Sequence, residues 1–339
     1  MTNILIVRMS ALGDIVHALP VLSALRAAYP SAKIDWLVES SYAGILDLVE
    51  GLNERIIVRP GYLRALMTMR SRPYDAAIDL QGLLKSAVAA RLSGARRVIG
   101  FEERALRERA AAWLYTERAP VADNVHVIQK NLSVLPLLGV QISSISSISS
   151  ITNTIPTIPL RKPRSRVIDH VTSLAPDGFA LINPGAAWPN KRWPPERFGA
   201  VAKRLRDTTG LRPFVLWGAR EAPLADEVVS ASDGAATRAP ETTLADLLAL
   251  SRHAALMVSG DTGPVHIAAA VGTPIVALYG PTWPERNGPW HPDDEVVSRA
   301  ETCECHHKRQ CQRASRCIDD ITIDEVNAAV ERRLRKVRV

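Results

Sequence analysis

Residues that could do chemistry gather where short apolar runs end. The stretch SGDTGPVHIAAA places Asp261, Thr262, Gly263 and His266 directly after the run ALMV and at the start of an apolar helical pattern. Pro264 suits the first turn of a helix, and Thr262 suits its N-cap. Unpaired amides and the positive end of the dipole make a helix N-terminus a site for phosphate or another anion. A lone Asp-Thr pair more commonly just caps a helix, so the glycines and His266 are what favour ligand binding here.

A second junction of the same kind spans NPGAAWPNKRWPPERF, residues 183–198. It follows the run FALI, and we expect its helix to begin near Pro195. Lys191 lies in the connecting loop, where an ammonium group can offset the charge of a leaving diphosphate. The alternative is a solvated basic loop. In WGAREAPLADE, Glu221 follows a strand and can accept hydrogen bonds from ribose hydroxyls, although many glutamates occupy such loops without a ligand.

The N-terminal half carries two more polar junctions. In RMSALGDIVHALPVL, Asp14 lies at the start of the first helix, where a carboxylate can act as general base toward an attacking hydroxyl or simply cap the helix. The stretch AIDLQGLLKSAVAARL holds Gln81, Gly82, Lys85 and Ser86. A lysine near a helix start opposes the helix dipole, which indicates a nearby anion or a solvated side chain.

Arginines add positive charge to this half, which is consistent with a phosphorylated or carboxylated acceptor. They are Arg64, Arg70, Arg72, Arg104, Arg107 and Arg109.

All four cysteines lie in one late segment, CECHHKRQCQRASRC at residues 303–317. Four thiols with His306 and His307 could hold a structural zinc ion or an iron–sulfur cluster. The spacing C-x-C-x5-C-x5-C departs from the paired CxxC of common zinc modules, so a surface loop of reduced thiols remains the alternative. The positions concerned are Cys303, Cys305, Cys311 and Cys317.

The elements that would position these residues alternate as strand and helix along both halves. Short β-branched runs such as NILIV, KIDWLV, FALI and PIVALYG are separated by helical patterns, which is typical of parallel sheets covered by helices on both faces. We predict an α/β protein of two doubly wound domains, residues 1–160 and 166–339, with a Ser/Ile-rich linker at about 141–165. Ligands would bind where the carboxyl ends of the strands border a shared cleft, with Asp14 pointing across it.

Composition places the chain among folded globular proteins. Its 339 residues are 47% hydrophobic and 23% charged, and its apolar runs are too short to span a bilayer. The N-terminus lacks the pattern of a signal peptide, so we expect a cytoplasmic protein. The net charge of +7 favours anionic partners, whether phosphorylated ligands, acidic lipid headgroups or nucleic acid.

Five of these stretches, in order, resemble the heptosyltransferases of lipopolysaccharide core synthesis, which form glycosyltransferase family 9. The stretches are RMSALGDIVHALPVL, DLQGLLKSAVAARL, NPGAAWPNKRWPPERF, WGAREAP and SGDTGPVHIAAAVGTPIVALYGPTWP. The resemblance covers nearly the whole chain. It implies the GT-B architecture of two facing Rossmann-like domains, with the lipid acceptor bound by the first and the nucleotide sugar by the second, and an inverting reaction that needs no metal ion and no cofactor.

The resemblance also implies roles for individual residues. Asp14 would be the general base, Lys191 would neutralise the ADP diphosphate and Glu221 would bind the ribose. The donor-binding loop would comprise Asp261, Thr262, Gly263 and His266, and the candidate acceptor-binding residues are Arg64, Gln81, Gly82, Lys85 and Ser86.

The implied donor is ADP-L-glycero-β-D-manno-heptose and the implied acceptor is Kdo-lipid A. SALGDIVHALP and DLQGLLKSA most resemble the members that add the first heptose to Kdo, whereas the cysteine segment is more like the tail of other members, so a different acceptor stays open. A lipid acceptor places the expected site of action at the cytoplasmic face of the inner membrane, through peripheral contact by the basic first domain.

Two other classes fit less well. A dehydrogenase would carry G-x-G-x-x-G after its first strand, where this chain has SALGD. A nucleic-acid-binding protein would gather basic residues with aromatic ones, but the basic residues are spread out and aromatics make up only 5% of the chain. We therefore expect no nucleic-acid partner.

Overall fold

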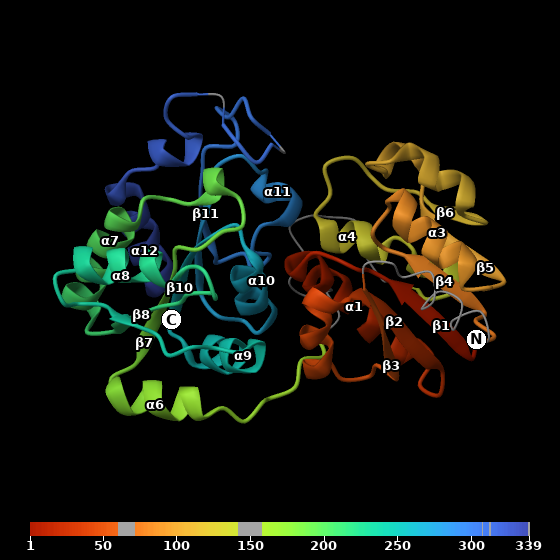
Figure 1. Cartoon of the computed structure of the whole chain (residues 1–339), viewed down its shortest axis with the longest axis horizontal. Helices are drawn as coiled ribbons and strands as arrows, with labels where there is room; N and C mark the ends of the chain where they lie inside the picture. Colours follow the sequence, from red (N-terminus) through yellow and green to blue (C-terminus); the bar gives the residue numbers. More distant parts are fainter. Residues whose placement is uncertain (60–71, 142–157, 307, 312, 338–339) are drawn as a thin grey trace. The chain divides into compact units, whose positions relative to one another are not determined.

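The computed structural model describes residues 1–59, 72–141, 158–306, 308–311 and 313–337 (Figure 1). The chain divides into two compact units, Met1–Arg161 and Lys162–Val339. The predicted Ser/Ile-rich linker lies largely outside the described residues, as does Arg64.

The first unit is built on a six-stranded parallel sheet with the order β3-β2-β1-β4-β5-β6. The strands are β1 (Asn3–Val7), β2 (Lys33–Glu39), β3 (Glu54–Val58), β4 (Ala76–Asp79), β5 (Arg97–Phe101) and β6 (Glu117–Ala119). The connections contain the α-helices α1 (Leu12–Ala28), α3 (Leu84–Leu92) and α4 (Val127–Leu132), and the 3-10 helices η1 (Ser40–Leu48), η2 (Glu103–Ala105), η3 (Arg109–Leu114) and η4 (Leu135–Leu138). The chain order reverses between β1 and β4, as in a doubly wound fold.

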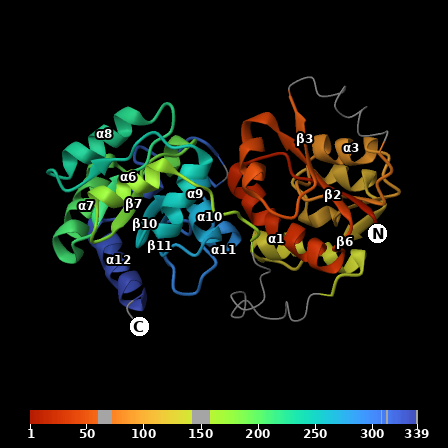
Figure 2. The same cartoon turned by 90° about the horizontal axis from the view of Figure 1, so that it is seen from below.

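The second unit repeats this plan with the order β12-β11-β10-β7-β8-β9, again with every strand pair parallel. The strands are β7 (Phe179–Asn183), β8 (Arg212–Val215), β9 (Thr237–Arg238), β10 (Leu256–Gly260), β11 (Ile275–Tyr279) and β12 (Glu295–Ser298). The α-helices are α6 (Arg166–Leu174), α7 (Pro195–Thr209), α8 (Ala222–Ala231), α9 (Leu244–His253), α10 (Gly263–Ala270), α11 (Pro284–Asn287) and α12 (Ile323–Val337), and the 3-10 helices are η6 (Pro189–Lys191) and η7 (Cys317–Asp320). Helix α7 packs with α8 and α12, and α10 packs with α9, so helices cover both faces (Figures 1 and 2).

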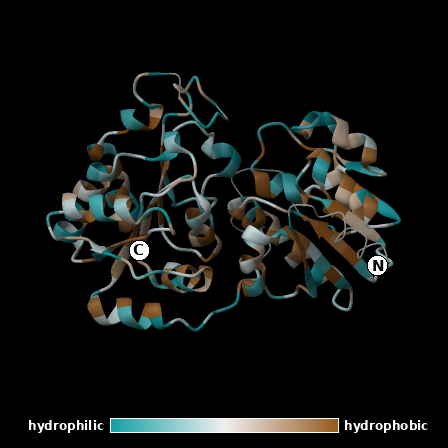
Figure 3. Ribbon diagram, in the orientation of Figure 1, coloured by the Kyte–Doolittle hydropathy of each residue, from teal (hydrophilic) through white to brown (hydrophobic). Residues whose placement is uncertain are grey.

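Burial explains why these segments are strands. All residues of β4, β7, β10 and β11 are buried, as expected of parallel strands that helices cover on both sides. Hydrophobic residues accordingly follow the strands in Figure 3, while α7 and α12 alternate polar and apolar residues. Because the strands of each sheet run in one direction, the loops after β7, β10 and β11 meet at one edge of the second sheet, and those after β1 and β4 meet at one edge of the first.

The predicted fold class is confirmed: the chain is an α/β protein of two Rossmann-like parallel-sheet domains. Among the described residues, no helix has both the length and the apolar composition that crossing a membrane requires.

Candidate active site

Asp261, which follows β10, is a buried carboxylate that four side chains contact. Its Oδ1 accepts a hydrogen bond from Asn287 Nδ2 at 2.9 Å and lies 3.2 Å from His266 Nε2. Its Oδ2 accepts from Thr282 Oγ1 at 2.7 Å and forms an ion pair with Lys191 Nζ. These partners come from the connections after β7 and β11 and from the first turn of α10, so Asp261 holds them together at the carboxyl edge of the sheet.

The electrostatics of this group follow from its partners. Burial alone would raise the pKa of Asp261, but the contacts with His266 and Lys191 outweigh burial and hold that pKa well below its ordinary value. Asp261 is therefore ionised under ordinary conditions, and both of its oxygens are engaged. It fixes the positions of Lys191 and His266.

The N-terminus of α10 is arranged as the sequence predicts, with one difference. Thr262 occupies the N-cap in an extended conformation and Pro264 lies in the first turn, but no side chain of the described residues caps the helix. The Thr262 hydroxyl instead lies 2.9 Å from Asn183 Nδ2, which also donates to Ser259 Oγ at 2.8 Å. The amides of Gly263 and its neighbours are therefore not taken up by a side-chain cap, which suits an anion site.

Three features of the structure fix the position of Lys191. It ends the 3-10 helix η6, its Nζ lies 4.8 Å from the centre of the Trp188 ring, and Asp261 faces it. Its backbone also runs close to β10, since a Cβ added to Gly260 would lie 3.0 Å from Lys191 O. The ammonium group is thus placed at the start of α10, where charge on a diphosphate could be offset.

Glu221 lies beside the turn that follows β7. It occupies the N-cap of α8, and its Oε2 accepts from Gly218 N at 3.2 Å. A Cβ added to Gly185 would lie 2.3 Å from that same oxygen. The absence of a side chain at position 185 therefore lets the carboxylate reach the carboxyl edge of the sheet.

In the first unit, Asp14 caps the start of α1, and its role as general base stays a prediction. Its Oδ2 accepts from Ala11 N at 3.3 Å at the start of α1, and Arg8 Nη2 lies 2.8 Å from its Oδ1. The side chain of Asp14 remains 35% exposed, so solvent or a substrate can reach it. Gln81 Oε1 accepts from Met9 N at 2.8 Å, which brings Gln81 to the same edge.

The other predicted acceptor residues surround a buried acid. Asp79 ends β4, and burial raises its pKa, while Ser86, Tyr115 and the amides of Gln81 and Gly82 donate to it. Ser86 is fully buried, so it stabilises the loop from within. The acceptor roles of Gln81, Gly82 and Ser86 stay predictions.

Two basic residues have partners within the chain. The anion expected near Lys85 is Glu39, whose Oε1 lies 2.7 Å from Lys85 Nζ. Arg72 pairs with Asp35 at 3.0 Å and with Glu54 at 2.5 Å, so its charge is neutralised locally. Neither partner was foreseen from the sequence, and the acceptor role of Lys85 stays a prediction.

Sequence reasoning also missed Thr282, Asn287, Asn183 and Arg8. Thr282 lies just past the predicted strand PIVALYG. Because β10 and β11 are neighbours, the shared-edge argument that selected Asp261 applies equally to the residues after β11. Asn287 offered no comparable signal, because it ends the short helix α11.

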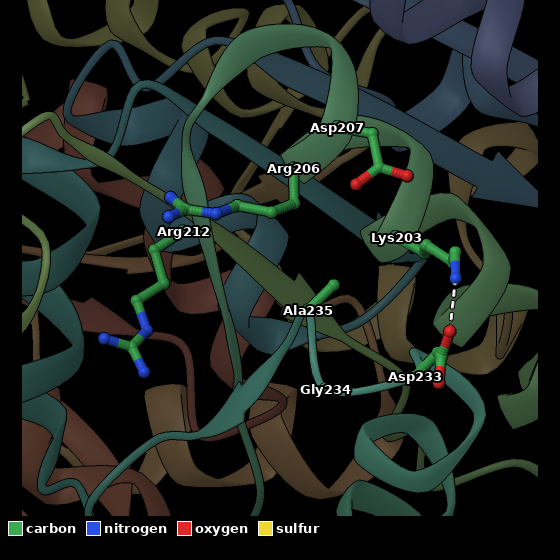
Figure 4. Close-up of a pocket in the computed structure, with 7 residues that line it drawn as sticks. All are labelled: Lys203, Arg206, Asp207, Arg212, Asp233, Gly234 and Ala235. Carbon is green, nitrogen blue, oxygen red and sulfur yellow. Dashed lines mark hydrogen bonds and ion pairs between the residues drawn. The ribbon is translucent and has the colours of Figure 1, made fainter.

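A surface pocket lies elsewhere on the second unit (Figure 4). It involves the C-terminal part of α7 and the start of β8, and in it Lys203 pairs with Asp233. Its lining residues are Lys203, Arg206, Asp207, Arg212, Asp233, Gly234 and Ala235. This is the amino edge of the sheet, opposite the loops that carry Lys191 and Asp261, so the pocket is separate from the candidate site.

Comparison with known proteins identifies the family. The model of glycosyltransferase family 9 (heptosyltransferase) matches residues 63–316. This chain belongs to that family. It is 29% identical over 301 residues to lipopolysaccharide heptosyltransferase 1 of Pseudomonas aeruginosa, covering 84% of this chain and 81% of the relative. It is 26% identical to lipopolysaccharide heptosyltransferase 3 of Escherichia coli, covering 95% of each. The structure of E. coli heptosyltransferase WaaC with ADP aligns with a TM-score of 0.72 at 24% identity over 99% of both chains.

The Asp261–Lys191 ion pair makes stability depend on pH. A lowered pKa stabilises the folded state above the unfolded value of about 3.9, and that contribution is lost as the pH falls through the folded-state pKa. Lys191→Met should lower the free energy of unfolding by about 1–3 kcal/mol at pH 7, because a buried carboxylate loses its cation but keeps three partners. The difference should shrink at acidic pH, once Asp261 is protonated in the variant.

Urea denaturation of both proteins at a series of pH values measures this difference. Lys203→Met is the matched control, because it removes a lysine from an exposed ion pair of the same unit. A stability difference that stays constant from neutral to strongly acidic pH would contradict the assignment to Asp261.

Proposed function

We propose that this protein is an inverting heptosyltransferase that moves L-glycero-D-manno-heptose from ADP-heptose to the Kdo of lipid A, the reaction of heptosyltransferase I in lipopolysaccharide inner-core synthesis. The observation that carries the proposal is the group around Asp261, which fixes a lysine and a helix N-terminus side by side. Family membership supports the reaction class, and the group around Asp261 supports our choice of where the donor binds.

The donor half of the site suits a nucleoside diphosphate. The Lys191 ammonium and the first-turn amides of α10, beginning at Gly263, can share the two phosphates, whose charge grows as the sugar leaves. Glu221 stands against the turn after β7, where its carboxylate can accept hydrogen bonds from the ribose hydroxyls. The buried contacts of Asp261 with Lys191 and His266 hold the lysine beside the start of α10. Asn183 donates a hydrogen bond to the Thr262 hydroxyl and so fixes the N-cap residue.

The acceptor half centres on Asp14. Its carboxylate takes the proton of the acceptor hydroxyl while that oxygen bonds to the anomeric carbon, and the bond to the diphosphate breaks with its electron pair leaving on ADP. Attack from the face opposite the leaving group inverts the anomeric centre. Arg8 orients the Asp14 carboxylate through the ion pair, which favours a single geometry for proton transfer.

The reaction proposed here uses no metal ion and no cofactor. A cation is required where a diphosphate leaves, and in this site Lys191 and the dipole of α10 supply positive charge. The proposal therefore rests on residues of the chain alone.

A second candidate function differs in the acceptor: heptosyltransferase II or another family 9 transferase. The relative of 26% identity that covers 95% of this chain is a heptosyltransferase 3. Such an enzyme would keep the donor site and accept a heptose or another sugar in place of Kdo.

An exposed aromatic residue supports action on a lipid at the cytoplasmic face of the inner membrane. Trp113 in η3 is 81% exposed, and Arg107 and Arg109 beside it are exposed as well. Tryptophan settles at the level of lipid headgroups, and arginines attract anionic lipids. This segment is the place where the first unit would contact the membrane peripherally.

The first test follows ADP release from ADP-heptose with and without Kdo-lipid A, with mass spectrometry of the lipid. We expect release to depend on the acceptor and the lipid to gain one heptose. Kdo-lipid A that already carries one heptose is the comparison acceptor. Turnover on that lipid alone would favour the second candidate, and no binding of ADP-heptose at all would refute the donor site.

Replacing the proposed base separates its role from donor binding. Asp14→Asn should lower kcat by about 100-fold or more while ADP affinity stays within about twofold, because the base acts on the acceptor and not on the donor. Asp47→Asn is the control, since Asp47 is another partly exposed acid of the first unit that pairs with an arginine, Arg55. Near-normal turnover by Asp14→Asn would show that another group takes the proton.

The membrane contact is tested by sedimentation with vesicles that contain anionic lipids. Trp113→Ala should lower the bound fraction several-fold, because the binding free energy loses about 1–2 kcal/mol when the indole ring is no longer buried in the membrane. Added salt should lower the bound fraction further, because it screens the attraction between arginines and anionic lipids. Ile57→Ala removes an exposed apolar side chain from β3, at the other end of the same sheet, and should have little effect. Binding that is insensitive to salt, or equal loss in both variants, would contradict this contact.

A further inference from the structure

The cysteine segment between β12 and α12 gathers its thiols in one place. The sulfur atoms of Cys303, Cys305 and Cys317 all lie within 4.8 Å of one another, and the three residues are buried. Cys303 Sγ lies 3.1 Å from Cys317 Sγ and 3.3 Å from Cys305 Sγ. Cys311 packs against these three. Residues that are spread over 15 positions of the sequence, 303–317, thus converge on one point.

The distances match shared coordination better than a covalent bond. A disulfide would bring two sulfur atoms to about 2.05 Å, and every cysteine here is free. Four thiolates arranged tetrahedrally at about 2.3 Å from a zinc ion stand roughly 3.8 Å apart. Two of the sulfur–sulfur separations, 3.1 and 3.3 Å, lie between a disulfide bond length and that value, and all three sulfur atoms lie within 4.8 Å of one another, so small movements would bring them to one shared ion.

The segment has no aliphatic cluster of its own among the described residues. Residues 299–316 contain no helix or strand among those described, and the buried cluster of the segment consists of cysteines alone in the described part of the chain. A loop that lacks its own aliphatic core is commonly held by a disulfide or a metal ion. Basic residues accompany the thiols in the sequence, and their positive charge would offset the charge of four thiolates.

The same segment contacts the loops of the candidate active site. Asn190 Nδ2 donates to Lys308 O at 2.9 Å, and Arg316 Nη1 donates to Pro189 O at 3.0 Å, so the turn that ends in Lys191 rests on the segment. The His306 ring stacks on Trp283 with the ring centres 5.0 Å apart.

The close packing continues at the end of β11. A Cβ added to Gly280 would lie 2.9 Å from Ile318 Cβ and 3.4 Å from Cys317 Sγ, so the glycine lets the end of the cysteine segment pack closely against the loop of Thr282. His306 is engaged with Trp283 and with Pro281 O, so Cys311 is the remaining described candidate for a fourth ligand.

We propose that Cys303, Cys305, Cys311 and Cys317 bind one thiophilic divalent metal ion, zinc or ferrous iron, and that this ion fixes the loops carrying Lys191 and Thr282. Each thiol loses its proton to solvent as the ion binds, and the ion stays divalent throughout. The site is structural, since all four positions would be filled by protein and no coordination position is left for a substrate. The positioning part rests on the donor role proposed above for Lys191.

The metal is tested first on the intact purified chain, without chelators. Elemental analysis should find about one equivalent of zinc or iron per chain, and it identifies which. Cys317→Ser and the more exposed Cys311→Ser should each lower the metal content about tenfold. Replacement by cobalt should give the intense visible and near-ultraviolet absorption of a tetrahedral thiolate site.

Two outcomes overturn the metal site. One is native protein with no bound metal and no thiolate absorption after cobalt addition, with four thiols that react as free groups once the protein is unfolded. The other is a disulfide joining Cys303 to Cys317 in peptides prepared without reductant.

The positioning part has its own readout. Removal of the metal from the native protein should weaken ADP binding about tenfold by calorimetry, and added zinc or iron should restore it. Unchanged ADP affinity after verified metal loss refutes the link to the Lys191 loop and leaves the metal site intact. Failure of the metal-loaded protein to bind ADP would instead count against the proposed donor site.

Discussion

The buried charge of Asp261 is the constraint on which the rest of the site depends. An ionised carboxylate removed from water is costly unless its oxygens are paired, and here four side chains pair them. Those side chains belong to the loops after β7 and β11 and to the first turn of α10. The parallel sheet brings the ends of these loops near one another, and the contacts with Asp261 then connect them. One of these contacts fixes Lys191 at the start of α10, where we propose that the diphosphate binds.

Three glycines allow close approaches in this arrangement, because a Cβ at each of them would crowd a neighbouring group. Gly260 lets the Lys191 turn approach β10, Gly185 lets Glu221 reach the sheet edge, and Gly280 lets the cysteine segment pack behind the Thr282 loop. The cysteine segment thus contacts the same two loops, those of Lys191 and Thr282, that also contact Asp261. The positions of Lys191 and Thr282 follow from both supports together.

The sequence predicts the central strands well, because buried parallel strands are short apolar runs bounded by polar or turn residues. It also predicts the junction after β10, since SGDTGP combines a cap, a first-turn proline and an acid. It does not predict that Asn287 reaches Asp261 or that Glu39 pairs with Lys85, because both contacts join residues of different elements that only the tertiary fold brings together. The spacing of the cysteines does not predict that their sulfur atoms lie together. In an irregular loop the side chains point in no regular sequence of directions, so spacing alone does not show which of them meet.

The two sheets contrast in how they hold a buried acid at a strand end. Asp79 has neutral donors around it, Ser86, Tyr115 and backbone amides, and burial raises its pKa. Asp261 faces Lys191, and its pKa is lowered instead. Hydrogen bonds alone are enough to fold the loop after β4, whereas the loop after β10 also orders a cation. That difference fits the division proposed here, because only the half that binds a diphosphate needs a fixed positive charge beside its carboxylate.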